Sequence, residues 1–227
     1  MDVAYFLRSR IAFIRQFYDA ASVPFAESKR KIEAGEPPFV PPNSEDEEPP
    51  FLDEWTDADD SLCILGYACV SMLATAFHLL LKEWETQLGV PVDDSLRPLF
   101  KKEGWLKGYA AHFNRVAGIH FGEAPAELSL LEEIVLARNR IQHPESITRQ
   151  RTVYSSSDMS KLRRAFFVDE RDLALIDEFE QSGPSWLFPP TLKVTSEKLT
   201  GAITEVETFA AWFDEQVTAH WAGRYRG

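Results

Sequence analysis

Residues 62–81, LCILGYACVSMLATAFHLLL, form a run of twenty residues without a formal charge. A helix of this length is long enough to cross a lipid bilayer. Small and polar residues interrupt the run at Gly66, Ser71 and His78, however, and its flanks carry no Lys/Arg asymmetry of the kind that orients membrane spans. Helices that are apolar on every side also lie at the centre of helical bundles, or are shared between a core and a dimer interface. We therefore expect a buried central helix and no membrane span.

Helical periodicity continues on both sides of this run and predicts an all-α fold, arranged as an antiparallel helical bundle. The central helix is expected from about Asp53 to Leu88, where Gly89 and Pro91 end it. Other helices are expected at about 2–33, 98–118, 125–142 and 196–223. The first of them contains Pro24, which is a candidate for a break or a kink.

Two segments without helical periodicity divide this pattern. We expect an N-terminal amphipathic helix at 1–34, an acidic Pro-rich loop at 35–52 and a main helical domain at 53–220. An irregular insertion is expected inside that domain at about 150–195, before the last helix. Short strands are expected within the insertion, around Ala165–Val168 and Leu192–Val194.

Charge is distributed very unevenly along the chain. The net charge is −12, which taken alone argues against a nucleic-acid partner. Residues 35–60, however, hold ten Asp or Glu and no Lys or Arg, so the rest of the chain carries only −2. Residues 138–164 hold seven Lys or Arg and two acids, a local charge of +5. A basic surface of that kind could contact a polyanion, although a solvated loop has the same composition.

The composition is that of a globular protein, with 44% hydrophobic and 12% aromatic residues. Cys63 and Cys69 are the only cysteines, too few for a disulfide framework and six residues apart, which does not suit a zinc knuckle. The opening residues follow an amphipathic helical pattern, so we expect no signal peptide. These features favour a reducing, cytoplasmic setting.

The five histidines do not form a metal-binding pattern. No two lie four residues apart on a helix with a carboxylate between them, and we expect no metal ion or other cofactor. The chain has no glycine-rich phosphate loop and no nucleophile elbow. His78 is expected to be a core histidine, and Glu132 and Glu133 are expected on a solvated helix face.

Residues 136–146, LARNRIQHPES, carry the clearest chemical pattern in the chain. Asn139 and His143 are four residues apart and share a helix face, whereas Arg138 is turned away from His143 by roughly 140° on a regular helix. Pro144 disfavours helical geometry at His143, so the helix should end there. His143 would then be able to approach a neighbour, either Arg138 of the same chain or Arg138 of a second chain.

These residue types suit the cleavage of RNA without a metal ion. RNA carries its own nucleophile, the 2′-hydroxyl, next to the scissile phosphate. A histidine can transfer the required proton near neutral pH, and an arginine can stabilise the charge that develops on the phosphate oxygens. Asn139 could orient the histidine or contact the phosphate. Arg140, Arg149 and Arg151 are the candidates for steering the RNA backbone.

Arg138 and Asn139, followed after three residues by His143, resemble the motif of the HEPN superfamily. The apolar helix before the motif and the amphipathic helix at the end of the chain are similar to that family over about residues 53–215. The resemblance implies an all-α bundle that forms a homodimer, in which two Arg–His motifs face each other as a metal-independent endoribonuclease site. It also implies a catalytic site made by Arg138 and His143, with Asn139 as the polar residue that follows the arginine. The setting that it implies is a toxin–antitoxin system or anti-phage defence, with a possible antitoxin or defence-system partner.

A second interpretation is a non-catalytic helical dimer that binds a protein or a nucleotide. In that case the acidic residues 35–60 would mask the basic stretch or bind a basic partner.

Overall fold

The computed structural model describes residues 2–42, 49–144, 146–162, 164–174 and 189–224 of the chain. These residues form a predominantly helical fold with no extended β-strand among them, which confirms the predicted all-α class. Three helices are long: α1 (Val3–Ala34), α2 (Leu52–Leu88) and α8 (Ser196–Arg224). The shorter helices are η1 (Asp94–Leu96), α3 (Arg97–Glu103), α4 (Trp105–Ala117), η2 (Phe121–Glu123), α5 (Leu128–Gln142) and α6 (Ser156–Met159).

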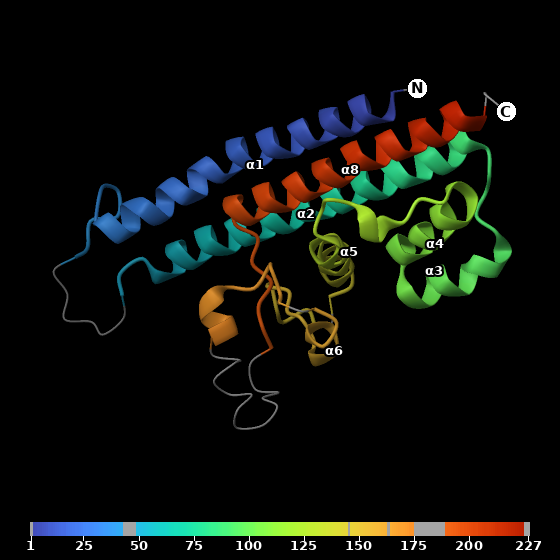
Figure 1. The fold of residues 1–227 in the computed structure, drawn as a ribbon. Coiled ribbons are helices and arrows are strands. Elements are labelled where there is room, and N and C mark those ends of the chain that lie inside the picture. The colour runs from blue at the N-terminus through green and yellow to red at the C-terminus, as the bar shows by residue number, and fades with distance from the viewer. Residues whose placement is uncertain (1, 43–48, 145, 163, 175–188, 225–227) are drawn as a thin grey trace.

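The three long helices lie side by side, with the shorter elements below them in the view of Figure 1. α1 runs opposite to α2, whereas α2 and α8 run in the same direction. Phe77 contacts Phe209, and further along both helices Trp84 contacts Trp221. The uniformly antiparallel bundle that we predicted is therefore not observed, because the segment before α8 brings the chain back to the first half of α2.

Helix α2 is long and apolar enough to cross a membrane, yet 61% of its most apolar 18-residue window is buried inside the fold. Leu73, Phe77 and Leu81 on this helix are completely inaccessible to solvent. A stripe that is buried in this way stabilises a helix chiefly by removing apolar surface from water. Burial within the fold thus explains why most of residues 62–81 are apolar.

Aromatic side chains fill the core where α2, the α4–η2 region and α8 meet. Phe77 lies edge-on to Phe209 with ring centroids 5.2 Å apart, and Phe113 lies edge-on to Phe213 at 4.8 Å. Phe121 contacts both rings of α8. Edge-to-face contacts of this kind add to the free energy gained from burial alone.

Helix α1 shares this core and does not form a separate unit. Its buried residues are Val3, Leu7, Ile11, Ile14 and Tyr18, spaced three or four apart, and they join the same apolar cluster as α2 and α8. Pro24 neither breaks nor ends the helix, which continues to Ala34 and stops at Gly35 with a φ of 63°. Within the acidic Pro-rich loop, residues 43–48 lie outside the described residues.

The helix expected at 98–118 is divided into two. Gly104, with φ 89° and ψ 168°, ends α3 and begins α4. The two short helices then fold against each other so closely that a Cβ atom on Gly108 would lie 2.3 Å from the ring of Phe100. Two glycines therefore determine how α3 and α4 pack together. Gly104 contributes its backbone conformation, and Gly108 contributes its lack of a side chain.

The insertion belongs to the core of the domain. Tyr154, Phe167 and Leu192 are completely buried. The strands that we expected occur only as isolated antiparallel bridges, between Val153 and Thr191 and between Val168 and Leu192. Residues 175–188 lie outside the described residues, so the structure gives no account of the middle of the insertion.

Glu133 of α5 holds the insertion in place through a buried carboxylate. It accepts hydrogen bonds from the backbone N–H of Phe166 at 2.7 Å, the backbone N–H of Phe167 at 2.8 Å and the Tyr154 hydroxyl at 3.2 Å. Burial raises the pKa of Glu133, although these hydrogen bonds oppose the shift. Our expectation of a solvated face at this position was therefore wrong for Glu133, whereas Glu132 is partly exposed and faces Lys107.

Replacing Glu133 by alanine leaves three buried donors without an acceptor. We expect Glu133→Ala to lower the free energy of unfolding by about 3 kcal/mol or more, since each unsatisfied buried group costs about 1–3 kcal/mol. The matched control is Glu132→Ala, which should change stability by less than about 0.5 kcal/mol. Urea unfolding followed by circular dichroism measures both, and equal effects of the two variants would contradict this role for Glu133.

The close approach of α2 to the start of α8 depends on Gly66. A Cβ atom at this position would lie 2.5 Å from the carbonyl oxygen of Val194 and 2.8 Å from its Cβ. We expect Gly66→Ala to destabilise the fold by about 2 kcal/mol through this overlap, despite the better helix propensity of alanine. Gly122→Ala is the control, because a Cβ there meets no atom within 4 Å. Thermal unfolding compares the two, and unchanged stability of Gly66→Ala would contradict this packing.

Candidate functional site

Helix α5 ends at Gln142, two residues before Pro144, as its sequence predicts. The N–H of His143 donates the last helical hydrogen bond, to the carbonyl of Asn139 at 3.1 Å. His143 itself has left helical geometry, with φ −125° and ψ 66°. Its side chain is exposed and makes no hydrogen bond to another described residue. Proline thus places an exposed imidazole, without a hydrogen-bond partner among the described residues, at the end of a helix.

His143 lines a groove of about 490 Å³ between the end of α5, the following loop and α2. Ile64 and Ala68 of α2 form an apolar wall, and Arg149 and Ile147 of the loop lie along the other side. Sequence reasoning did not connect α2 with this site. The spacing of Ile64 and Ala68, four apart within the uncharged run, was the available signal, but only the fold shows which side of α2 faces α5.

Arg138 does not line this groove. Its guanidinium donates to the side-chain oxygen of Asn139 at 2.9 Å. Its charge acts instead on His78 of α2, whose pKa is lowered by burial, by Lys82 and by Arg138. Arg138 and His143 therefore lie on different flanks of α5 within one chain. The side chain of Asn139 contacts the arginine and makes no hydrogen bond to the imidazole of His143.

Arg140 forms part of the anchor of the insertion. Its Nε lies 2.7 Å from Asp158, whose side chain is only 2% exposed, and its guanidinium also donates to Ser155 at 3.0 Å. Burial alone would raise the pKa of Asp158, but the hydrogen bonds from Arg140 and Ser155 keep it below its usual value. Arg140 therefore forms an ion pair with a buried carboxylate and also lines the groove, and its role in steering RNA stays a prediction.

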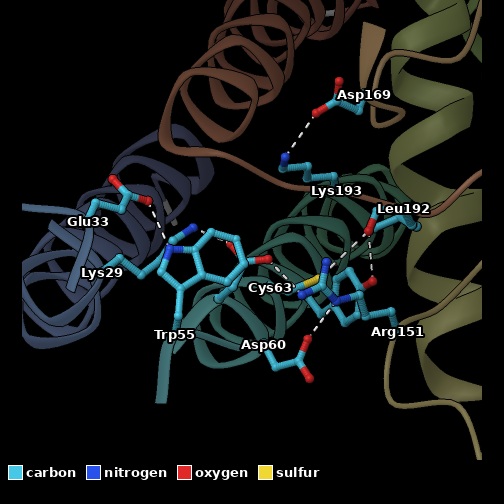
Figure 2. Close-up of polar contacts among 11 residues, drawn as sticks. Lys29, Glu33, Trp55, Asp60, Cys63, Arg151, Asp169, Leu192 and Lys193 are labelled. Carbon is cyan, nitrogen blue, oxygen red and sulfur yellow. Dashed lines mark hydrogen bonds and ion pairs between the residues drawn. The ribbon is translucent and has the colours of Figure 1, made fainter. Parts of the chain in front are cut away.

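Arg151 is likewise bound to acidic residues, at the start of α2 (Figure 2). Its guanidinium contacts Asp60 at 2.5 Å and Asp59 at 2.6 Å. Asp59 is shared with Lys29 of α1, which also lies over the ring of Trp55 at 4.2 Å. Arg151 thus joins the insertion to α1 and α2, and it also lines the groove. Its role in steering RNA stays a prediction.

A second set of polar contacts completes this junction. The Tyr67 hydroxyl donates to the carbonyl of Leu192 at 2.7 Å and accepts from the N–H of Thr152 at 3.1 Å. The thiol of Cys63 also lies 3.8 Å from the carbonyl of Leu192 (Figure 2). Cys63 is buried here, and burial raises the pKa of its thiol. This cysteine is therefore part of the packing between α2 and the insertion.

Arg149 is the one predicted RNA-steering arginine that makes no ion pair within the described residues. It is exposed and lines the groove together with His143. The structure therefore brings His143 and Arg149 into one groove, which Arg138 does not line.

Two of the other histidines, His78 and His112, have structural surroundings. His78 is half-buried and stacks on Trp105 with ring centroids 4.7 Å apart. His112 is 1% exposed, and burial lowers its pKa. Among the residues that the structure describes, no group of three or more His, Cys, Asp or Glu side chains is arranged to hold a metal ion.

No known protein family, no curated protein and no solved structure matches this chain. The resemblance to the HEPN superfamily therefore stays a prediction that rests on Arg138, Asn139 and His143.

Replacement of Arg140 and replacement of Arg149 should differ sharply in their effect on the free energy of unfolding. Arg140→Ala leaves the buried carboxylate of Asp158 without its ion pair, and we expect a loss of about 3 kcal/mol in the free energy of unfolding. Arg149→Ala should change it by less than about 0.5 kcal/mol, because this side chain is exposed. Chemical denaturation of both variants measures the difference, and a fully stable Arg140→Ala would contradict the anchoring role.

Proposed function

We propose that this chain is a metal-independent endoribonuclease whose active site is completed by a second copy of the chain. The observation that carries the proposal is the exposed His143 at the end of α5, in a groove that it shares with the exposed Arg149. An imidazole that is accessible to solvent, next to a guanidinium without an acidic partner among the described residues, suits proton transfer beside a phosphate.

The proposed reaction uses the 2′-hydroxyl of RNA as the nucleophile. His143 removes the proton from this hydroxyl, and a bond forms between the 2′-oxygen and phosphorus. The bond from phosphorus to the 5′-oxygen of the next nucleotide breaks, and that oxygen takes up a proton. The products are a 2′,3′-cyclic phosphate and a free 5′-hydroxyl. Arginine side chains stabilise the added negative charge on the phosphate oxygens.

A second copy is needed because Arg138 and His143 of one chain lie on opposite flanks of α5. In a symmetric pair, Arg138 of one copy can complete the groove that holds His143 of the other. The resemblance to the HEPN superfamily supports this arrangement, and with it a cytoplasmic role in toxin–antitoxin or anti-phage defence. An antitoxin or another defence-system protein would then be the natural regulator of the site.

The test is RNA cleavage by the purified chain in the presence of a chelator. We expect products that end in a 2′,3′-cyclic phosphate, and we expect His143→Ala to reduce the rate by at least about 100-fold, the usual contribution of a general acid or base. Arg138→Ala should also reduce the rate, because it removes a cation that stabilises the transition state.

His220→Ala is the matched control, since His220 is a histidine of α8 on a different element. This variant should cleave as fast as the wild type. Cleavage that persists unchanged in folded His143→Ala would rule out this residue as the acid or base.

A second candidate function is favoured by the ion pairs of Arg140 and Arg151. Because acidic residues of the same chain neutralise both, the basic stretch offers a polyanion less charge than its sequence suggests. A non-catalytic helical dimer that binds a protein or a nucleotide would need no free basic surface. Under this alternative, His143→Ala and Arg138→Ala would leave activity in cells unchanged, whereas deletion of residues 36–50 would abolish it.

A further inference from the structure

A second groove, of about 500 Å³, lies between α1 and α2. We call it the α1–α2 groove and define it by Arg10 and Phe13 of α1, Ser71 and Thr75 of α2, and Gln142 at the end of α5. Its volume falls within the range of about 300–1,000 Å³ that is usual for ligand sites. We propose that the α1–α2 groove binds one nucleotide of a single-stranded RNA, with the base stacked on Phe13 and the phosphate paired with Arg10.

Phe13 offers an aromatic surface to a ligand. Its side chain is 59% exposed, although α1 contributes other residues to the core. Phe13 and Phe17 stack on each other with ring centroids 6.1 Å apart and an interplanar angle of 7°. Phe17 does not line the groove, whereas Ser9 and Arg10, one turn before Phe13, do line it. Phe13 therefore ends a stack of two rings with the groove beside it, and a nucleobase would extend this stack.

Arg10 supplies one positive charge to the same groove. It is exposed and makes no ion pair or hydrogen bond with another described residue. It lies three residues before Phe13, so the guanidinium and the ring share one side of α1. Among the described residues that line the groove, Arg10 is the one cation and none is acidic. A single arginine of this kind matches one phosphodiester, which carries one negative charge.

The neutral polar groups of the groove suit the edge of a base. The side-chain amide of Gln142 is exposed, has no hydrogen-bond partner among the described residues, and offers both a donor and an acceptor. The hydroxyl of Ser71 is shielded from solvent and also lacks a partner within the described chain. A buried hydroxyl without a partner is unfavourable, and a turn of this side chain towards a bound base would satisfy it. Thr75 donates to the carbonyl of Ser71 at 2.8 Å, and its hydroxyl oxygen can still accept a hydrogen bond.

This combination of groups disfavours other classes of ligand. A metal ion would need carboxylates or several imidazoles, and the described lining has neither. A purely apolar segment would bury Arg10 without a counter-charge, which is unfavourable. A neutral sugar would leave the arginine without an anion, and a polyphosphate would need more than one cation. A nucleotide within a strand uses the aromatic ring, the single cation and the amide together.

The α1–α2 groove adjoins the groove that holds His143. Gln142 lines the α1–α2 groove and His143 lines the other, although the two residues are neighbours in the chain. On α2, Ala68 lines the groove of His143, and Ser71, three residues further on, lines the α1–α2 groove. The end of α5 therefore lies between two successive hollows along α2. A strand with a phosphate at His143 would place an adjoining nucleotide in the α1–α2 groove, and this step rests on the proposed function.

Binding of a short 2′-O-methyl RNA tests the proposal, because this strand has no free 2′-hydroxyl and cannot be cleaved by it. Fluorescence anisotropy of the labelled strand measures its dissociation constant for the full chain. Phe13→Ala should raise this constant at least about 5-fold, which corresponds to the weaker end of base–aromatic stacking. Phe6→Ala is the matched control and should bind like the wild type, because Phe6 is 52% exposed on the same helix and does not line the groove.

The salt dependence of binding tests Arg10. Each phosphate contact that is lost should reduce the slope of log affinity against log salt by about 0.7 for a single strand. Arg10→Ala should show this smaller slope, together with weaker binding at low salt. Arg8→Ala is its control, since Arg8 is exposed on α1 but does not line the groove. The side chains replaced in all four variants are exposed, so each variant should keep the circular dichroism spectrum and melting temperature of the wild type.

Three results would overturn the proposal: equal affinities of Phe13→Ala and Phe6→Ala, an unchanged salt slope in Arg10→Ala, or no binding of the strand by the wild type. Adenosine and uridine monophosphates distinguish a strand from a free nucleotide as the source of the base. Each should compete only weakly, because a mononucleotide cannot span both grooves. A mononucleotide that binds as tightly as the strand would assign the groove to a free nucleotide and overturn its link with His143.

Cleavage assays separate this inference from the proposed function. With both in place, Phe13→Ala should raise KM for unmodified RNA. A wild type that binds the strand through Phe13 and Arg10 but cleaves no RNA would keep the nucleotide site and remove the endoribonuclease. Cleavage by Phe13→Ala with an unchanged KM would keep the endoribonuclease and overturn the nucleotide site.

Discussion

The enclosure of α2 is the constraint on which the rest of the structure depends. Twenty consecutive uncharged residues cannot remain in water at acceptable free energy, so other elements must cover them. α1, α5 and α8 each cover part of the circumference. The side that they leave open carries Ile64 and Leu79, next to the exposed phenylalanines of α1. The same apolar helix therefore builds the core and still exposes apolar side chains on one side.

Polar contacts then hold the insertion against the helices. Several charged side chains at this junction are paired with groups of opposite charge. Glu133 and Arg140 of α5 bind the insertion, and Arg151 of the insertion binds the start of α2. Burying or partly burying such groups is favourable only when every donor and acceptor is matched. Arg140 and Arg151, which appear in the sequence as part of a basic surface, are thus structural. Arg149 and His143 remain exposed in the groove, and they are the groups that can meet a ligand.

The proposed chemistry depends on how α5 ends. Pro144 removes His143 from the helix, so its imidazole is carried at the tip of a rigid element and has no competing partner in the described chain. Arg138, one turn earlier, is held by Asn139 on the other flank. Separation of the two groups within one chain is the reason why the proposed function requires a second copy, which is the simplest source of the missing arginine.

The sequence by itself determined the features that depend on local chemistry. The apolar run predicted a central helix, Gly35 and Gly89 mark the ends of α1 and α2, and Pro144 ends α5 at the predicted residue. Each of these follows from residues within one or two helical turns, where backbone propensity and periodicity act.

Only the tertiary structure decided which charged side chains are available to a ligand and in which directions the helices run relative to one another. Arg151 and Asp60 are 91 residues apart, and Glu133 binds an N–H 33 residues away. The parallel course of α2 and α8 likewise depends on where the insertion returns the chain. Pairings across such distances are selected by the packing of the whole core, and no local pattern records them.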